Sequence, residues 1–410
     1  MQYGLIGEKL IHSFSKEIHA KIGDYDYELV PLKREELRPF LTAANFKAVN
    51  VTIPYKEAVL PYLDYVSPDA QKIGAVNLIV NRFGKLYGYN TDYYGAKRLI
   101  ERANVQVKGK KALIFGSGGT QKTLRAVLTD LGAKSIYTVS RKKSDSTVDY
   151  AEATTTHSDA EILINTTPVG TFPDLFATPV DPSLFFNLQG AIDVVYNPLR
   201  TSFIEQIKSR NIPCDNGLFM LAAQAVQASA IMRDIPLDET LCESVYQKVL
   251  RDKQNVVLIG MPSCGKSTIG RILSEKTHKK FVDTDELIKS RTGMEIPELF
   301  ARYGEDRFRE EETAAILSVA HESSLIVATG GGIVKHAENI RLLKKNGKIV
   351  FLDRPIEALT PTADRPLFND LSKLAALQEE RFPLYKAAAD ATVQNVTEAE
   401  ETAEKILALL

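Results

Sequence analysis

Short apolar runs alternate with polar stretches along the whole chain, in a rhythm typical of α/β proteins. Three such runs, YGLIG, AVNVTI and AVNLIV, lie in the first 100 residues, with polar stretches of helical character between them. After Lys110 the order becomes regular. ALIF predicts a strand that runs into a glycine turn, TLRAVLTDLG predicts a helix that ends at glycine, and SIYTV predicts the next strand. This pattern predicts a strand–helix–strand unit of a parallel sheet.

The same rhythm continues to the end of the chain, with one polar break. Strands are predicted at 161–168 and 191–198, each of which ends at a proline, and residues 217–232 predict a helix with one largely apolar face. The polar stretch RDKQN at 251–255 leads directly into the strand VVLIG and is the best linker candidate. Beyond it, the runs VVLIG, KKFVDTD, SLIVATGGG and KIVFLDRP predict a compact domain with a parallel sheet.

Composition and charge narrow the class of protein. A chain of 410 residues can form two or three domains, and 44% hydrophobic with 25% charged residues is typical of a folded, soluble protein. The net charge of -1 gives no reason to expect nucleic acid or a membrane as a partner, and no apolar run approaches the length of a membrane span. Three widely spaced cysteines indicate neither a disulfide framework nor a zinc site. We therefore expect a cytoplasmic protein, and the sequence leaves homo-oligomer formation open.

The stretch GMPSCGKST matches a phosphate-binding loop. It fits G-x-x-x-x-G-K-[ST] at Gly260, Gly265, Lys266 and Ser267, with an apolar strand before it and a helical pattern after it. In such a loop the backbone N–H groups surround the phosphates, the lysine reaches the β and γ oxygens, and the serine hydroxyl ligates Mg²⁺. We therefore predict a site for ATP and Mg²⁺ here and include Thr268 in it. The motif does not identify the group that accepts the phosphate.

Residues suited to an acceptor follow at the ends of later strands. KKFVDTD ends in Asp283 and Asp285, which lie two residues apart and therefore on the same side of an extended chain. One carboxylate could hold the water shell of the metal while the other accepts a hydroxyl proton, although DTDELI also fits a helix N-cap. Arg309 in FRE is either a ligand of the acceptor or an ordinary solvated arginine. Three glycines at 330–332 end the strand SLIVAT, where they allow a ligand to approach the backbone closely.

Residues 254–410 resemble shikimate kinases, because GMPSCGKST, FVDTD, FRE, TGGG, DRPL and ERFPLY occur in the order found in that family. The resemblance implies that Asp285 binds the hydroxyls of the acceptor and acts as the base, with Asp283 near Mg²⁺. Phosphoryl transfer would then depend mainly on positioning and on charge neutralisation. The other implied substrate contacts are Arg309 and Arg381 at the carboxylate, Gly330, Gly331 and Gly332 at the ring hydroxyls, and Arg365, which moves in with the lid.

The lid is where the sequence departs from that family. The stretch RPIEALTPTAD is short and contains proline, and no arginine lies between Arg354 and Arg365. Shikimate kinases usually have a longer lid that carries a further arginine near the nucleotide. The sequence therefore leaves open how tightly ATP is held.

Two polar residues in the first 100 suit proton transfer. Lys56 follows the apolar strand and the Pro-Tyr turn of NVTIPYK, and Asp92 ends YGYNTD after another strand-like run. A lysine beside an aspartate can pass a proton to or from a hydroxyl or carbonyl group when the pair lies at a cleft. The sequence alone does not show that these side chains meet, and an ordinary surface lysine is the alternative.

A glycine loop and a basic turn point to a dinucleotide. FGSGGT places Gly116, Gly118 and Gly119 between the strand ALIF and a helix, although Gln121 occupies the third glycine position of G-x-G-x-x-G. The next strand ends without the acid that would bind the ribose of NAD. An arginine there favours the 2′-phosphate of NADP, and a solvated basic turn is the alternative. This basic turn consists of Ser140, Arg141 and Lys142.

Residues 1–250 resemble shikimate dehydrogenases, because HSFS, NVTIPYK, GAVN, NTD, GSGG, SRK, NTTPVG, VVYNP and NGLFMLAAQA occur in that family's order. The resemblance implies that Lys56 and Asp92 form the acid/base pair. The other implied contacts are Ser13 and Ser15 at the substrate carboxylate, Thr52, Asn77, Asp92 and Gln224 at its hydroxyls, Tyr196 as a wall of the site, and Gly217 at the nicotinamide end. Two positions depart from the family: Lys16 replaces a proline, and Tyr93 replaces the glycine after Asp92, which leaves the fit of the substrate there open.

The two resemblances together predict a bifunctional α/β enzyme of the shikimate pathway, which leads to chorismate and aromatic amino acids. It would reduce 3-dehydroshikimate with NADPH and phosphorylate shikimate with MgATP. The predicted domains are an α/β substrate domain (1–100, completed by helices at 216–250), a Rossmann domain for NADP (101–215) and a P-loop kinase domain with helices on both faces of a parallel sheet (254–410). Two alternatives remain: an NAD-linked quinate/shikimate dehydrogenase, against which Arg141 argues, and a non-catalytic P-loop module, which only the short lid supports.

Overall fold

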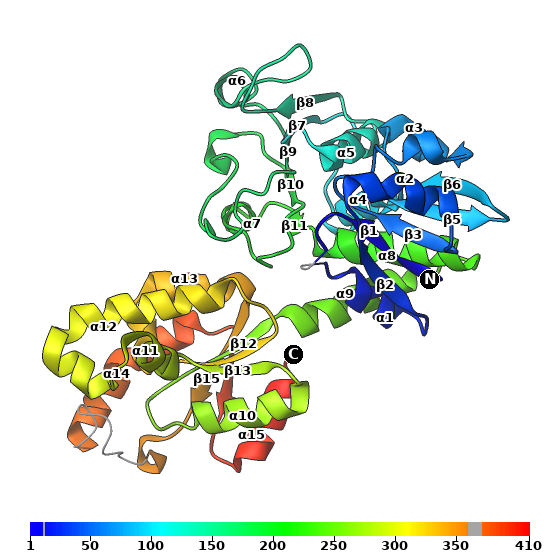
Figure 1. Cartoon of the computed structure of the whole chain (residues 1–410). Coiled ribbons are helices and arrows are strands. Elements are labelled where there is room, and N and C mark those ends of the chain that lie inside the picture. The colour runs from blue at the N-terminus through cyan, green and yellow to red at the C-terminus, as the bar shows by residue number, and fades with distance from the viewer. Residues whose placement is uncertain (11–12, 360–370) are drawn as a thin grey trace. The chain divides into compact units, whose positions relative to one another are not determined.

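The computed structural model describes residues 1–10, 13–359 and 371–410, and only the backbone of residues 371–374. The chain divides into two compact units (Figure 1). Unit 1 consists of Met1–Tyr196 and Thr201–Leu250, and unit 2 consists of Asn197–Arg200 and Arg251–Leu410.

The first lobe of unit 1 is a mixed sheet covered by helices. Its strands are β1 (Tyr3–Gly7), β2 (Tyr27–Pro31), β3 (Ala48–Val51), β4 (Tyr65–Val66), β5 (Leu78–Arg82) and β6 (Lys85–Tyr89). Its helices are α1 (Ser15–Ile22), α2 (Arg34–Ala43), η1 (Leu60–Tyr62), α3 (Pro68–Ile73), α4 (Thr91–Arg102), α8 (Leu218–Arg233) and α9 (Thr240–Lys253). The strand order is β2-β1-β3-β5-β6-β4, with β5 antiparallel to both of its neighbours. The apolar helix α8 packs on α1, α4, β3 and β5, and so brings a late part of the chain back to this lobe.

The second lobe of unit 1 is a parallel sheet in the order β11-β10-β9-β7-β8. Its elements are β7 (Lys111–Phe115), α5 (Gly119–Asp130), β8 (Ser135–Val139), α6 (Tyr150–Thr155), β9 (Ile162–Asn165), η2 (Pro182–Leu184), β10 (Gly190–Asp193), α7 (Ser202–Lys208) and β11 (Cys214–Asn216). β7 pairs with β8 on one side and with β9 on the other, so the chain adds its next strands in the opposite direction from β7. The carboxyl end of β7 is therefore a switch point of the sheet. In open parallel sheets this switch point is where ligands bind.

Unit 2 is also built on a parallel sheet, in the order β13-β14-β12-β15-β16. Its strands are β12 (Asn255–Ile259), β13 (Lys280–Asp283), β14 (Leu325–Ala328), β15 (Gly347–Asp353) and β16 (Ala391–Gln394). Its helices are α10 (Lys266–Thr277), α11 (Thr284–Thr292), α12 (Ile296–Ala320), η3 (Ile333–Lys335), α13 (Ala337–Asn346), η4 (Ile356–Ala358), α14 (Leu371–Ala388) and α15 (Ala399–Leu407). α10 packs on α15, α12 packs on α13, and Figure 1 shows the two pairs on opposite sides of the sheet.

The predicted fold class is confirmed, and several element boundaries differ from the prediction; the strand predicted at 161–168, for example, ends at Asn165. The strand predicted at 191–198 ends at Asp193, because the carboxylate of Asp193 accepts a hydrogen bond from Val195 N and turns the chain there. The predicted linker 251–255 is not an extended connector. Its first three residues form the last turn of α9, and Asn255 begins β12. Basic side chains such as Arg251 and Lys253 suit the carboxyl end of a helix, which explains why the helix continues through this polar stretch.

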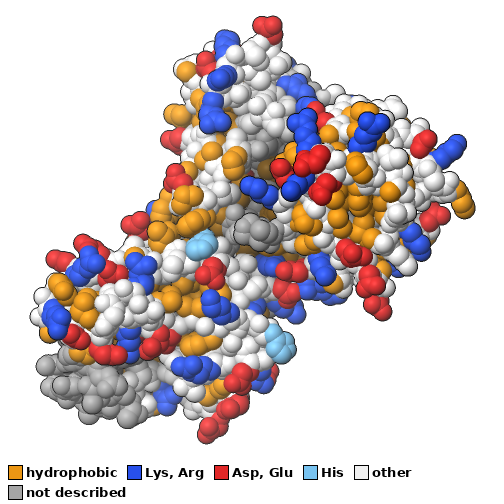
Figure 2. Space-filling view, viewed as in Figure 1, with side chains coloured by type: hydrophobic (Ala, Val, Ile, Leu, Met, Phe, Trp, Pro, Cys, Tyr) orange, Lys and Arg blue, Asp and Glu red, His pale blue; other side chains and the backbone are white. Residues whose placement is uncertain are grey.

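In the described part of the chain, no helix is long and apolar enough to cross a membrane. On the face that Figure 2 shows, acidic and basic side chains are interspersed. That distribution agrees with the net charge of -1.

Candidate active sites

Lys56 and Asp92 meet in the first lobe of unit 1. Lys56 lies in the loop after β3, Asp92 lies in the first turn of α4, and Lys56 Nζ donates to Asp92 Oδ2 at 2.6 Å. The loop is held firmly, because the buried Tyr55 donates its hydroxyl to Leu32 O and the carbonyl of Lys56 accepts from Val76 N. The two side chains are 26% and 17% exposed, so both can be reached from solvent while they stay paired. The arrangement suits proton transfer.

Asn77 and Gln224 converge on Thr91, the residue before Asp92. Asn77 Oδ1 accepts from Thr91 N at 2.7 Å, and its Nδ2 donates to Thr91 Oγ1 at 3.0 Å. Thr91 Oγ1 also donates to Gln224 Oε1, on α8, at 3.3 Å. Asn50 fixes this group from β3 by donating to Asn77 O. Thr91 and Asn50 were not predicted, although both belong to the NTD and NVT segments of the sequence.

The predicted carboxylate-binding serines lie at the start of α1. Ser13 Oγ donates to Ser15 Oγ at 3.1 Å, and it accepts from Ser15 N at 3.2 Å. The ring of Phe14, between them, lies 5.5 Å from the ring of Tyr196, measured between centroids. Burial raises the pKa of Tyr196. The structure thus places Phe14, which lies between the two serines in the chain, beside Tyr196, while Thr52 lies half-buried directly after β3.

The glycine loop lies at the switch point of the second lobe, between β7 and α5. Gly116 has a φ of +106°, and a Cβ there would lie 2.6 Å from Thr166 Oγ1. A Cβ on Gly118 or Gly119 would meet no atom within 4 Å. Packing within the protein therefore does not require glycine at these two positions, whereas close approach of a phosphate to the backbone at the start of α5 does.

Gln121, which occupies the third glycine position of the motif, has a structural role of its own. The side chain is buried, and its Nε2 donates to Thr138 Oγ1, on β8, at 2.7 Å. The amide thus bridges α5 and β8, where a glycine would bring them together by close backbone contact. The basic turn follows at the end of β8, and in it Arg141 and Lys142 are exposed and Ser140 is half-buried.

Gly217 is required by the backbone beside it. A Cβ at this position would lie 2.1 Å from Val194 O, and Gly217 N donates to Val195 O at 3.1 Å. The start of α8 therefore lies against the segment that leads to Tyr196. This contact brings the predicted nicotinamide end next to a predicted wall of the substrate site.

In unit 2, the phosphate loop joins β12 to α10. Lys266 is buried, and its Nζ donates to Gly260 O and Met261 O, both at 2.9 Å. Gly265 has a φ of +94°, which favours glycine. Asn395, after β16, donates to Cys264 O at 2.6 Å and so stabilises the loop. The sequence did not predict this contact. The loop, with Thr268 in the first turn of α10, has the form of a phosphate site.

Asp283 caps a helix, as one of the two interpretations of the sequence has it, and it also lies at the phosphate loop. Its Oδ1 accepts from Asp285 N at 3.0 Å, so Asp283 caps α11. Its Oδ2 accepts from Ser267 Oγ at 2.7 Å. A carboxylate and a hydroxyl side by side at the phosphate loop fit Mg²⁺, which binds proteins through few oxygen ligands and shares the phosphates of the nucleotide.

Arg309, Asp285 and the glycine segment 330–332 meet beside the end of β14. A Cβ on Gly330 would lie 3.0 Å from Asp285 Oδ1, and a Cβ on Gly332 would lie 2.9 Å from Arg309 Nη1. Arg309 is therefore not a solvated arginine. Its Nη1 donates to Glu312 Oε2 at 2.9 Å, and Glu312 is 1% exposed. Burial raises the pKa of Glu312, which sequence reasoning missed although it lies one helical turn after Arg309.

Arg381 reaches the same segment from α14. Its Nη1 donates to Gly331 O at 3.1 Å, and the hydroxyl of Tyr385 donates to the same oxygen. Arg381 is 6% exposed, and its Nε is buried and makes no hydrogen bond to the described residues. A buried guanidinium with an unused donor suits a carboxylate ligand. Arg365, the remaining predicted contact, lies outside the described residues.

Comparison with family models and known proteins gives matches for both units. The model of the shikimate dehydrogenase substrate binding domain matches residues 5–79, and the shikimate kinase model matches residues 262–410. The shikimate dehydrogenase (NADP(+)) of Clostridium beijerinckii is 39% identical over 261 residues, which cover 60% of this chain and 96% of that enzyme. The corresponding enzyme of Methanosphaera stadtmanae is 34% identical over 254 residues, covering 56% of this chain and 89% of that enzyme.

Solved structures match the same region. Shikimate dehydrogenase 1 of Peptoclostridium difficile has a TM-score of 0.55 at 36% identity and covers 61% of this chain and 98% of its own. The Thermus thermophilus shikimate 5-dehydrogenase in complex with NADP(H) and shikimate has a TM-score of 0.54 at 30% identity, covering 60% of this chain and 99% of its own.

Proposed function

Because the chain belongs to the shikimate dehydrogenase family and ends in a shikimate kinase domain, we propose that it makes shikimate at one site and phosphorylates it at the other. It is an enzyme of the shikimate pathway with NADP-dependent oxidoreductase and ATP-dependent phosphotransferase activities. The proposed reactions are reduction of 3-dehydroshikimate with NADPH and transfer of the γ-phosphoryl group of MgATP to the 3-hydroxyl of shikimate.

In the dehydrogenase site, Lys56 is proposed as the proton donor. Bound NADPH supplies the hydride that adds to the ketone carbon. The Lys56 ammonium gives its proton to the ketone oxygen as this oxygen becomes a hydroxyl, and Asp92 Oδ2, at 2.6 Å, keeps Nζ in position before and after the transfer. Ser13 and Ser15 would bind the substrate carboxylate, and Thr52, Asn77 and Gln224 its hydroxyls. Hydroxyl donors suit a carboxylate, and amides can donate to a hydroxyl and accept from it.

In the kinase site, Asp285 is proposed as the acceptor of the hydroxyl proton. Bound MgATP supplies the phosphoryl group. Arg309 and Arg381 would hold the shikimate carboxylate from α12 and α14, while the glycine segment 330–332 lets the ring approach the backbone. In this structure Lys266 Nζ donates to the carbonyls of Gly260 and Met261. The same ammonium N–H groups would donate to the β and γ phosphates of a bound nucleotide.

The observation that carries the kinase proposal is the convergence of Asp285, Arg309 and Arg381 on one glycine segment. A P-loop module that only bound a nucleotide would not need a base and two guanidiniums around such a segment. This argues against the non-catalytic alternative. The exposed Arg141 at the end of β8 supports NADP over NAD, in line with the NADP-dependent relatives and the NADP(H) complex of the Thermus enzyme. A cytoplasmic location fits a pathway of soluble metabolites, and the oligomeric state is left open.

Two assays on the purified chain test the proposal. With 3-dehydroshikimate, NADPH absorbance should decay, and NADH should support a slower decay. With shikimate and MgATP, ADP should form only when shikimate is present. Decay with NADH alone would favour the NAD-linked alternative, and ADP formation that does not depend on shikimate would contradict the kinase assignment.

A further inference from the structure

Tyr93, which replaces the usual glycine after Asp92, turns away from the Lys56–Asp92 pair. Its hydroxyl donates to Asp130 Oδ2 at 2.6 Å, and its ring packs against Ile73, Ala75 and Ala126. Successive residues of a helix point about 100° apart, so one turn of α4 can direct Asp92 to Lys56 and Tyr93 to α5. Tyr93 therefore does not lie over the carboxylate of its neighbour.

The contacts of Tyr93 join the two lobes of unit 1. Tyr93 is on α4 and Lys72 is on α3, both in the first lobe, and Asp130 is the last residue of α5 in the second lobe. Both oxygens of Asp130 are used, since Lys72 Nζ donates to Oδ1 and Tyr93 donates to Oδ2. These two partners lower the pKa of Asp130. Residues of α3 and α4 thus meet the carboxylate at the end of α5.

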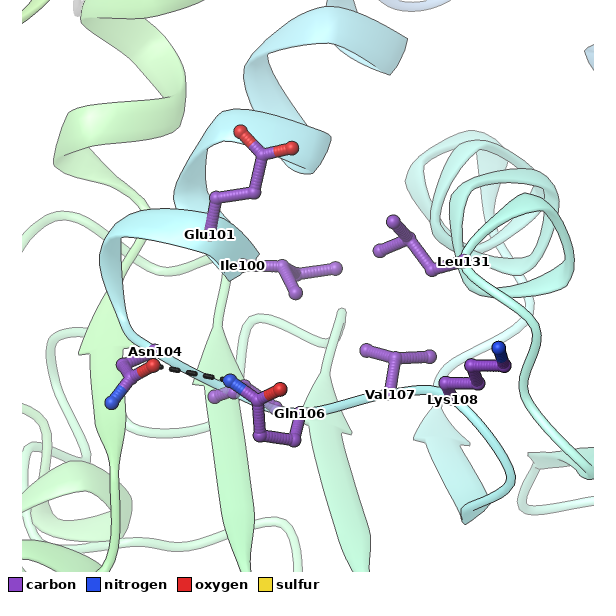
Figure 3. Close-up of a pocket in the computed structure, with 8 residues that line it drawn as sticks. Ile100, Glu101, Asn104, Gln106, Val107, Lys108 and Leu131 are labelled. Atoms are coloured by element: carbon purple, nitrogen blue, oxygen red, sulfur yellow. Dashed lines mark hydrogen bonds between the residues drawn. The ribbon is translucent and has the colours of Figure 1, made fainter.

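The other end of α4 also lies against the second lobe, where Arg102 pairs with Asp215 of β11. A cavity of about 340 Å³ lies there, lined by Ile100 and Glu101 of α4, by residues 104–108 that connect the lobes, and by Leu131 next to Asp130 (Figure 3). Ile100 lies two helical turns after Tyr93 and so on the same face of α4. The contact of Tyr93 with Asp130 therefore shares with the Arg102–Asp215 pair the fixing of the angle between the lobes.

That angle matters for the reaction. α5 begins at Gly119, in the loop proposed to hold the NADP phosphates, and ends at Asp130. A helix of 12 residues is a rigid rod about 18 Å long, so a displacement at Asp130 also moves the loop at the other end. On the other side of the contact, Tyr93 directly follows Asp92. The hydroxyl–carboxylate contact therefore joins the helix that carries the proton-transfer pair to the helix that starts at the nucleotide.

We propose that Tyr93 and Asp130 are positioning residues of the dehydrogenase, which hold the nucleotide lobe at the distance from the substrate lobe that hydride transfer requires. This inference rests on the proposed dehydrogenase function. A misplacement of about 1 Å can slow a reaction between two bound groups by as much as 10². The Tyr93–Asp130 contact is partly exposed, with the Asp130 side chain 40% exposed, and so the expected loss of kcat is on the order of fivefold.

The test is a double-mutant cycle of Tyr93→Phe and Asp130→Asn in the full chain. Phe keeps the ring against Ile73, Ala75 and Ala126, and Asp130→Asn changes only an exposed side chain, so both variants should fold. Tyr93→Phe should lose about fivefold in kcat, Asp130→Asn, which also weakens the Lys72 contact, should lose at least as much, and the double variant should lose no more than Asp130→Asn alone. The primary isotope effect measured with NADPH deuterated at the transferred hydrogen should rise, because hydride transfer becomes more rate-limiting.

Glu57→Gln is the matched control. Glu57 directly follows Lys56 and also pairs with α5, through Lys122 at 2.7 Å, but the two side chains are 58% and 44% exposed. This variant should change kcat by less than about twofold. Shikimate-dependent ADP formation by the same chain controls for the amount of folded protein.

Unchanged kcat and isotope effect in both variants would overturn the proposal. So would a loss of kcat without a rise in the isotope effect, or losses that multiply in the double variant, because these indicate only a general loss of stability. If the wild-type chain did not reduce 3-dehydroshikimate, the proposed function itself would be wrong, and that result is seen before any variant is compared.

Discussion

Lys56 Nζ lies 2.6 Å from Asp92 Oδ2, although the two residues are 36 positions apart in the chain. The loop after β3 supplies the lysine, and the first turn of α4 supplies the aspartate. A salt bridge at a surface commonly contributes little to stability, and this one is partly exposed. Its position among Asn77, Gln224 and Thr91 therefore indicates a role in catalysis and not in the stability of the fold.

Lys56→Ala should lower the kcat of the dehydrogenase by about 10² or more, the usual size of a lost acid or base. The kinase site lies in unit 2, so the rate of shikimate phosphorylation should stay at its wild-type value. Lys85→Ala, which removes an exposed lysine from β6, is the control and should leave both rates unchanged. Steady-state rates of NADPH consumption give the comparison. A Lys56→Ala enzyme with the wild-type kcat would exclude Lys56 as the proton donor.

Glu312→Gln should weaken shikimate binding to the kinase. The Glu312 carboxylate holds Arg309 Nη1 at 2.9 Å, and a neutral amide would hold the guanidinium less firmly. Loss of one hydrogen bond between charged groups corresponds to about tenfold, so the KM for shikimate should rise by about that factor while the KM for ATP stays constant. Glu310→Gln, which removes an exposed partner of Arg307, is the matched control. An equal rise in both KM values would argue against a specific role at the acceptor.

The sequence predicted the glycine loops, the strands that precede them and the charged residues at the strand ends, because these depend on local backbone geometry. It did not predict Glu312 or Asn395, because the face of a helix or loop that meets a ligand site depends on long-range packing. Tyr93 shows the same limit. The sequence indicates a bulky ring beside Asp92, but the direction of that ring depends on α5, more than 25 residues away. The roles of the individual site residues remain predictions.

Arg141→Ala should change the preference for the cofactor. The exposed guanidinium at the end of β8 is expected to pair with the 2′-phosphate, which NADH lacks. The KM for NADPH should rise by about tenfold, and the KM for NADH should change little. Lys143→Ala, two residues further on and paired with Glu152, controls for general loss of positive charge in this turn. If both cofactors were affected equally, the 2′-phosphate contact would not be through Arg141.

The stability of unit 1 should fall in acid because of His19. This histidine is fully buried on α1, stacks on Tyr27 at 3.9 Å between ring centroids, and has a pKa that burial lowers to about 3 from 6.5. Between these two pKa values the unfolded chain binds a proton that the folded chain does not. The free energy of unfolding should therefore decrease as the pH falls below 6.5, by up to about 1.4 kcal/mol per pH unit.

His19→Phe keeps the ring stack and removes the titrating group, so it should flatten this dependence. Urea unfolding followed by circular dichroism from about pH 5 to about pH 7 gives the comparison, and the unchanged unit 2 contributes equally to both proteins. The variant also loses the hydrogen bond to Tyr25, which lowers the free energy of unfolding by the same amount at every pH and does not change its dependence on pH. Equal slopes for the variant and the wild type would contradict a neutral, buried His19.

We propose that one chain carries out two successive reactions. Purified protein supplied with 3-dehydroshikimate, NADPH and MgATP should accumulate shikimate 3-phosphate. Lys266→Ala, which removes the lysine of the phosphate loop, should stop the same mixture at shikimate, and Lys56→Ala should consume 3-dehydroshikimate about 10²-fold more slowly while added shikimate is phosphorylated at the wild-type rate. Production of shikimate without its 3-phosphate by the wild-type chain would contradict the kinase assignment, and production of neither compound would contradict both proposed activities.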